Sequence, residues 1–158
     1  MIQGTYYKEW STVLGREMEF KVYGHAGVPV LALPARGGRF YDWENNGMPD
    51  AIAQLLNEGK VQLFCADAMD GEGLLNGDLP QRRRAELQEK YFVYLTAELA
   101  PRILTLNNAK KGTRIWTAGV DLGAYHAVHC LCAVPPCLQV LWAWAHLRPD
   151  PLLGHRQR

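Results

Sequence analysis

Residues 119–123 carry the pattern best suited to chemistry in this 158-residue chain, Gly-Val-Asp-Leu-Gly. A β-rich run over residues 114–118 precedes them, and a helix-forming segment follows at once. Strand, sharp turn and helix in this order are typical of a nucleophile elbow, G-x-S-x-G, with Asp121 where the serine belongs. The glycines are needed because side chains at their positions would collide as strand and helix pack around a strained residue. The pattern therefore predicts an elbow that presents a carboxylate, and the only serine, Ser11, lies far away near the N-terminus.

Further candidate residues follow two earlier β-runs. A glycine pair comes directly after the apolar run 28–34, where free backbone N–H groups can point into a cleft; a plain flexible loop is the alternative. Asp67 and Asp70 follow the run 61–66. Because open α/β sheets place ligands at the carboxyl ends of their strands, these two acids could orient a ligand. Capping of turns is the simpler interpretation, and we favour it.

The elements that must position these residues alternate between strand and helix. Residues 17–23 alternate polar and apolar side chains, as in a half-buried strand, and residues 28–34 suit a strand buried on both faces. We expect strands at 17–23, 28–34, 61–66 and 114–118 and helices at 49–58, 81–99 and 122–133, after an irregular start over 1–16. This order predicts an α/β fold with a mostly parallel sheet and helices on both faces.

Composition limits the classes of partner. A chain of 158 residues with 48% hydrophobic content can form one domain with one core. The net charge of +1 gives no electrostatic case for binding nucleic acid or an anionic membrane. Neither a signal-peptide pattern nor an apolar run long enough to cross a bilayer is present, so we expect a cytoplasmic protein.

The composition changes at about Cys130. The last 29 residues hold three of the four cysteines, two of the five tryptophans and four of the nine prolines, but only one acidic residue. Such enrichment is typical of a GC-rich gene read in the wrong frame. Our leading hypothesis therefore divides the chain into a domain over 1–129 and an out-of-frame tail over 130–158. A genuine tail, in which residues 138–144 form the next buried strand, is one alternative.

A metal site is the other alternative for this region. The candidate ligands are of the two types that zinc favours: His126, His129, Cys130, Cys132 and Cys137. The Cys-x-Cys-x4-Cys spacing, however, lacks the paired Cys-x2-Cys knuckles of a structural zinc site. We therefore expect no metal.

Six segments together resemble an esterase group of the α/β-hydrolase superfamily that is related to esterase D. They are residues 14–27, 34–41, 47–48, 59–64, 67–70 and 119–127. The resemblance covers residues 5 to about 129 and does not extend through the tail. It implies an α/β-hydrolase fold that is truncated after the elbow helix, a small ester as substrate, and no cofactor.

In such enzymes the elbow serine attacks an ester carbonyl, and a histidine that is oriented by an acid activates it. The resemblance puts Asp121 at the nucleophile position. It assigns the oxyanion-hole N–H groups to Leu122 and to Arg36 or Gly37. The acid and the histidine follow the nucleophile on segments that this chain does not have. We therefore expect an esterase-type fold without hydrolytic activity, whose elbow strand has an unpaired edge and whose elbow helix has a poorly covered apolar face.

Two other functions stay open. Haloalkane dehalogenases and epoxide hydrolases use an elbow aspartate as nucleophile, but tryptophan usually follows it, whereas Leu122 does so here. An Asp-nucleophile hydrolase also needs a histidine near Asp121, and the direction of the elbow helix carries His126 and His129 away from it. The second possibility is a non-catalytic binding or assembly protein that self-associates through an exposed sheet edge.

Overall fold

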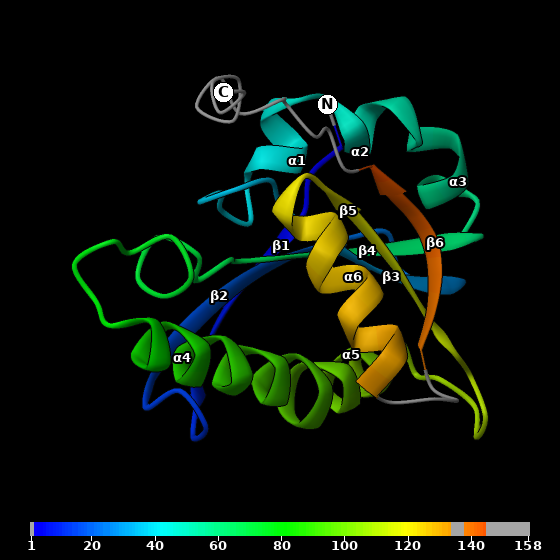
Figure 1. The fold of residues 1–158 in the computed structure, drawn as a ribbon. Helices are drawn as coiled ribbons and strands as arrows, with labels where there is room; N and C mark the ends of the chain where they lie inside the picture. Colours follow the sequence, from blue (N-terminus) through cyan, green and yellow to red (C-terminus); the bar gives the residue numbers. More distant parts are fainter. Residues whose placement is uncertain (1, 134–137, 145–158) are drawn as a thin grey trace, which may run out of the picture.

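A computed structural model describes residues 2–133 and 138–144, and its strands form one mixed sheet. Within these residues the order across the sheet is β1-β2-β4-β3-β5-β6 (Figure 1). The strands are β1 (Thr5–Ser11), β2 (Arg16–Tyr23), β3 (Val28–Leu33), β4 (Val61–Ala66), β5 (Ile115–Val120) and β6 (Leu138–Trp144). The pairings β1–β2 and β2–β4 are antiparallel, and β4–β3, β3–β5 and β5–β6 are parallel. The predicted parallel arrangement of β3, β4 and β5 is confirmed.

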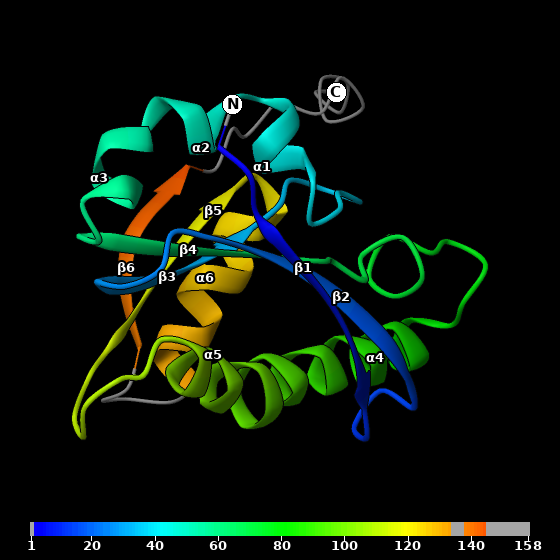
Figure 2. The ribbon, with the colours of Figure 1, turned by 180° about the vertical axis from the view of Figure 1, so that it is seen from behind.

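Helices cover both faces of this sheet, as predicted (Figures 1 and 2). One face carries three short helices, α1 (Asp42–Asn45), α2 (Met48–Ala51) and α3 (Ala53–Asn57). The other face carries α4 (Gln81–Val93), α5 (Ala100–Leu106) and α6 (Leu122–Ala133), with the π-helical segment η1 (Tyr94–Leu99) between α4 and α5. Two hydrophobic clusters, one on each face, form the core.

The hydrophobic pattern of the strands explains the two clusters. Met18 and Phe20 alternate along β2 and pack with Tyr91 of α4 and Ile103 of α5 in the larger cluster. In β3, five of the six residues are buried, because helices cover the strand from both sides. Side chains of β3 therefore enter both clusters, in keeping with its place in the sheet between β4 and β5.

The start of the chain is not irregular, and this expectation is wrong. β1 pairs with β2 along its whole length, from Thr5 opposite Val22 to Ser11 opposite Arg16. Most of β1 is exposed or half-buried, with Trp10 67% exposed. An edge strand with so little burial has no apolar alternation to reveal it.

The sheet also continues beyond the elbow strand. β6 pairs with β5 from Ile115 opposite Leu138 to Val120 opposite Trp144. The expectation of an unpaired edge at β5 is therefore wrong: the sheet has one strand more after the elbow helix, and within the described residues its outer strands are β1 and β6. α6 also crosses the expected boundary after residue 129 without a break. The origin of the tail in another reading frame stays a hypothesis, and residues 145–158 lie outside the described residues.

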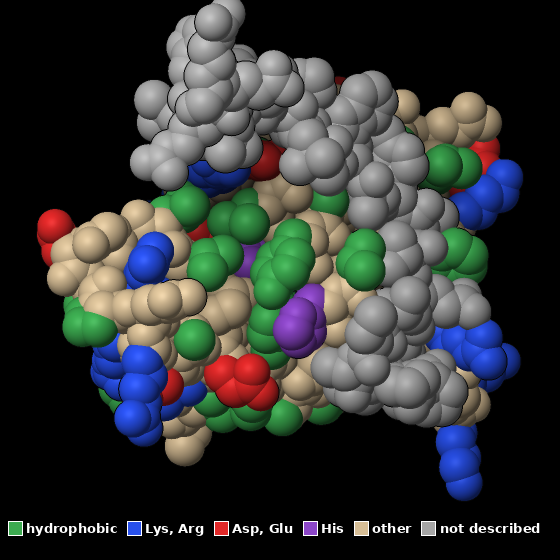
Figure 3. Space-filling view, viewed as in Figure 1, with side chains coloured by type: hydrophobic (Ala, Val, Ile, Leu, Met, Phe, Trp, Pro, Cys, Tyr) green, Lys and Arg blue, Asp and Glu red, His purple; other side chains and the backbone are tan. Residues whose placement is uncertain are grey.

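The outward face of α6 is only partly covered. Tyr125 is 47% exposed and Val128 is 45% exposed. Figure 3 shows hydrophobic side chains gathered over α6 beside a histidine. Ala124, Ala127 and Cys130 of the same helix are buried, so the expectation of a poorly covered apolar face holds only for the outer side of α6. Within the described residues, no helix combines the length and the apolar character that crossing a membrane requires.

Candidate active site

The elbow has the predicted geometry. Asp121 lies between β5 and α6 with φ of 54°, a left-handed conformation that is unusual for a residue other than glycine. A Cβ atom on Gly119 would clash with the backbone of Gly123, and one on Gly123 would clash with the carbonyl oxygen of Pro34. Both glycines are thus required by close backbone contacts, as the spacing predicts. The second contact also fixes the elbow helix against the loop that follows β3.

The side chain of Asp121 engages that loop. Its Oδ2 lies 3.4 Å from the backbone nitrogen of Arg36, which donates a long hydrogen bond, and 3.5 Å from Nε of the same residue. The Asp121 side chain is 31% exposed and that of Arg36 is 62% exposed, so solvent screens this ion pair. The carboxylate therefore occupies one of the N–H donors that the resemblance assigns to an oxyanion.

The other predicted donors lie in different surroundings. The N–H of Gly37 donates to Oδ2 of Asp70 at 3.4 Å instead of to a group on the elbow. Leu122 is the first residue of α6, where backbone N–H groups have no acceptor within the helix. Of the two alternatives in the loop, Arg36 is thus the one whose N–H contacts the elbow side chain.

Asp67 anchors the same loop. Its Oδ1 accepts hydrogen bonds from Phe40 N at 2.8 Å and from Arg39 Nε at 3.0 Å. Arg39 also pairs with Glu19 of β2. Burial raises the pKa of the Asp67 carboxyl, although the bonds from Phe40 and Arg39 oppose this effect. Asp67 thus anchors the loop after β3, 27 positions earlier in the sequence, and the favoured expectation that it caps a turn is corrected to this distant contact.

Asp70 forms a fully buried pair with His126. Nε2 of His126 lies 2.7 Å from Oδ1 of Asp70, and the two side chains are 0% and 1% exposed. Nδ1 of His126 lies 3.1 Å from Nε2 of Gln88 on α4. The side-chain amide of Gln88 thus binds one ring nitrogen, and the Asp70 carboxylate binds the other. Both ring nitrogens are therefore occupied, and His126 cannot serve a group at Asp121.

The remaining described histidines do not complete a catalytic site either. The ring of His129 stacks on Phe92, with 3.6 Å between ring centroids. His25 lies in the turn before β3, at the opposite end of that strand from the elbow. Within residues 2–133 and 138–144, no histidine forms a hydrogen bond or an ion pair with the Asp121 side chain. His146 and His155 lie outside the described residues.

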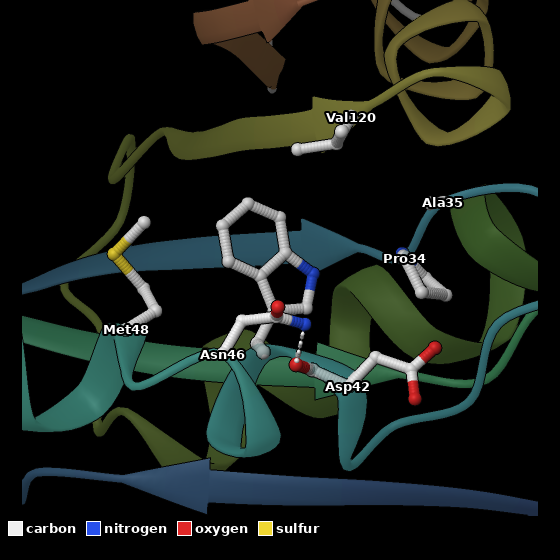
Figure 4. Close-up of a pocket in the computed structure, with 7 residues that line it drawn as sticks. Pro34, Ala35, Asp42, Asn46, Met48 and Val120 are labelled. Carbon is white, nitrogen blue, oxygen red and sulfur yellow. Dashed lines mark hydrogen bonds between the residues drawn. The ribbon is translucent and has the colours of Figure 1, made fainter.

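A cavity of about 380 Å³ opens beside the elbow strand (Figure 4). Its lining comes from the loop after β3, from α1 and α2, and from the end of β5: Pro34, Ala35, Asp42, Trp43, Asn46, Met48 and Val120. Asn46 is held in place by a hydrogen bond of 2.7 Å from its amide to the carbonyl oxygen of Asp42. The cavity is mostly apolar and lies next to the residue before Asp121, so it is suited to a small apolar group.

The described residues do not support the metal alternative. No group of three or more histidine, cysteine or acidic side chains among them is arranged to hold a metal ion. Cys130 is buried, and burial raises the pKa of its thiol to about 12, which disfavours the thiolate that zinc binds. The side chains of Cys132 and Cys137 lie outside the described residues.

Sequence reasoning identified the elbow and the loop but missed the Asp70–His126 pair. Each residue had been noted separately, Asp70 after a strand and His126 on the elbow helix. They are 56 positions apart, and no local pattern connects them. Only the parallel packing of β4 and β5 on either side of β3 brings them together.

Comparisons with known proteins find the same fold in esterases. No family model and no curated protein match the sequence. An S-formylglutathione hydrolase from Agrobacterium tumefaciens has a TM-score of 0.63 and 20% identity, over 87% of this chain and 56% of that one. The ferulic acid esterase AmCE1/Fae1A from Anaeromyces mucronatus has a TM-score of 0.65 and 13% identity, over 91% of this chain and 58% of that one. MPT51 (FbpC1) of Mycobacterium tuberculosis has a TM-score of 0.65 and 15% identity, over 87% of this chain and 49% of that one.

These similarities show that the chain has the fold of esterase-type α/β hydrolases, as the resemblance of its segments predicts. The chain spans about half the length of the solved structures it matches. At these identities the similarity extends to the fold alone.

Proposed function

We propose that this chain is a non-hydrolytic relative of carboxylic ester hydrolases, in which Asp121 has replaced the nucleophile. The observation that carries the proposal is the contact between the Asp121 carboxylate and the backbone N–H of Arg36. In an ester hydrolase, a donor at this place would hold the negative charge that develops on the carbonyl oxygen. Here the side chain of the elbow already supplies a negative charge to that donor.

The chemistry of ester hydrolysis argues in the same direction. A carboxylate at the elbow repels the charge that develops on an ester carbonyl oxygen, and it competes with that oxygen for the Arg36 donor. Proton transfer to the leaving group needs a histidine, and both ring nitrogens of His126 are already hydrogen-bonded. Loss of the nucleophile or the base costs several orders of magnitude in rate.

Hydrolysis of p-nitrophenyl acetate and butyrate tests the proposal. We expect the native chain, Asp121→Ala and Asp121→Ser all to give the rate of buffer alone, because serine without a histidine and an acid is not activated. Asp121→Ser in a chain whose C-terminal half is restored to the other reading frame should regain turnover. Turnover by the native chain that Asp121→Ala abolishes would contradict the proposal and would favour an aspartate nucleophile.

The cavity beside the elbow favours a second candidate function, the binding of small molecules without turnover. Trp43 lines this cavity and is 7% exposed, whereas Trp10 on β1 is 67% exposed and belongs to the far edge of the sheet. Titration with ethyl butyrate, followed by tryptophan fluorescence, tests it. A saturable change that is lost in Trp43→Phe and kept in Trp10→Phe would support binding in the cavity. The absence of a saturable change in the native chain would contradict it.

A further inference from the structure

The buried Asp70–His126 pair is a polar cluster to which the proposed function gives no role. It joins three segments that are distant in the sequence: the loop after β4, the elbow helix α6 through His126, and α4 through Gln88. Aromatic rings surround the imidazole, with the centroids of Tyr91 and Phe92 at 5.2 and 5.8 Å. In such a setting every polar atom needs a partner, and both ring nitrogens have one.

The second oxygen of Asp70 reaches the loop that carries the oxyanion-donor candidates. Oδ2 accepts the N–H of Gly37, while the neighbouring N–H of Arg36 goes to Asp121. Two successive amides of one loop therefore donate to two different carboxylates, one in the core and one at the elbow. The orientation of one amide restricts that of the other, because only the φ and ψ rotations of Arg36 separate the two planar peptide groups.

We propose that Asp70 and His126 are positioning residues that decide which loop N–H faces the elbow. His126 fixes the Asp70 carboxyl group, Asp70 keeps the Gly37 N–H turned into the core, and the Arg36 N–H is left for the group at position 121. His126 lies on α6, the helix that follows Asp121. The elbow helix therefore influences which N–H of the loop after β3 faces the elbow. The inference rests on the proposed function only in that it treats this loop as the oxyanion side of an ester site.

If the pair only stabilised the fold, the Arg36 N–H would still donate to Asp121 and the Gly37 N–H to Asp70 in any variant that folds. Backbone amide NMR separates the two roles, and the response to Asp121→Asn is the measured quantity. In the native background we expect this substitution to shift the Arg36 amide proton and to leave the Gly37 amide in place.

In His126→Phe, and in the milder Gln88→Leu, we expect the Arg36 response to fall by at least about twofold and the Gly37 amide to begin to respond, since coupled residues are not additive. Ile103→Val is the matched control: Ile103 is fully buried in the same hydrophobic cluster as Tyr91 and Phe92, but its side chain cannot form a hydrogen bond with either carboxylate, so the native responses should persist. Should His126→Phe fail to fold, Gln88→Leu and the native chain still decide the outcome.

An unchanged Arg36 response in Gln88→Leu and His126→Phe would overturn the positioning role. So would a Gly37 amide that already responds to Asp121→Asn in the native chain. Neither measurement involves ester turnover. Hydrolysis by the native chain would therefore refute the proposed function while leaving this inference to stand or fall on the amide shifts.

Discussion

Asp121 and Asp70 are carboxylates held by successive amides of one loop, yet their surroundings are opposite. Asp121 accepts the Arg36 N–H at 3.4 Å and lies 3.5 Å from the Arg36 guanidinium, with 31% of its side chain exposed. Asp70 accepts the Gly37 N–H at 3.4 Å and lies 2.7 Å from His126, with 1% exposed. Each acid has one backbone donor and one basic partner, so they differ chiefly in their access to water.

The comparison shows that an acid beside a basic group does not by itself mark a reactive site. An exposed pair is screened by solvent and contributes little to stability. A buried pair is costly to disrupt, because the remaining partner cannot turn to water. Asp121 is therefore the carboxylate that a ligand can reach, and Asp70 is the one that the fold depends on.

The largest expected effect comes from removing the buried acid. Asp70→Ala leaves the Nε2–H of His126 and the N–H of Gly37 without an acceptor in the core. We expect a loss of about 3–5 kcal/mol in the free energy of unfolding, measured by urea denaturation. Asp121→Ala is the control and should lose far less. A loss below about 1 kcal/mol in Asp70→Ala would remove the contrast between the two carboxylates.

The next largest effect concerns the backbone contact between the elbow helix α6 and the loop after β3. Gly123→Ala would drive a methyl group into the carbonyl oxygen of Pro34, so the elbow helix and the donor loop must separate. We expect a loss of about 3 kcal/mol, the upper range for overpacking. Gly77→Ala is the matched control, because no heavy atom lies within 4 Å of a Cβ placed there. Similar unfolding midpoints for the two variants would contradict the close contact.

Features that depend on local pattern were predictable from the sequence. The bounds predicted for α6, residues 122–133, are those observed, and the elbow glycines have the predicted role. β3 was predictable because burial on both faces requires a continuous apolar run. β1 was missed because an exposed edge strand needs no such run. The pairing of β6 was open because the composition of the tail argued for a different origin.

Features that depend on distant contacts were not predictable in this way. The sequence left Arg36 and Gly37 equivalent, and only the carboxylates on either side of the loop distinguish their amides. The role of His126 was likewise hidden, because a histidine on an apolar helix has the same local pattern whether it is buried with a partner or not. Its partner Asp70 is 56 positions away and is brought near by the sheet order.

A smaller effect is expected when the same substitution is made at both carboxylates. Asp121→Asn keeps the size of the side chain and tolerates the left-handed backbone, so it should change the free energy of unfolding by less than about 1 kcal/mol. In Asp70→Asn, one of the two accepting oxygens becomes an NH2 donor, which would face the N–H of His126 or of Gly37. This variant should therefore lose clearly more unfolding free energy. Equal losses in urea denaturation would mean that exposure does not separate the two sites.

The smallest effect sharpens the comparison with a third carboxylate, Asp67, whose side chain is 11% exposed and thus lies between the other two. Burial raises the pKa of Asp67 despite its bonds to Phe40 N and Arg39. A folded-state pKa above the unfolded value means that the folded chain binds this proton more tightly. The stabilisation is complete below the unfolded pKa and is lost as pH rises through the folded pKa. The difference in unfolding free energy between Asp67→Asn and the native chain should therefore move in favour of the variant as pH rises across that window.

Urea denaturation at several pH values measures this difference, and Glu72→Gln, on the exposed loop after β4, controls for general charge effects. A difference that moves toward the native chain over the same window would mean that the hydrogen bonds of Asp67 outweigh its burial.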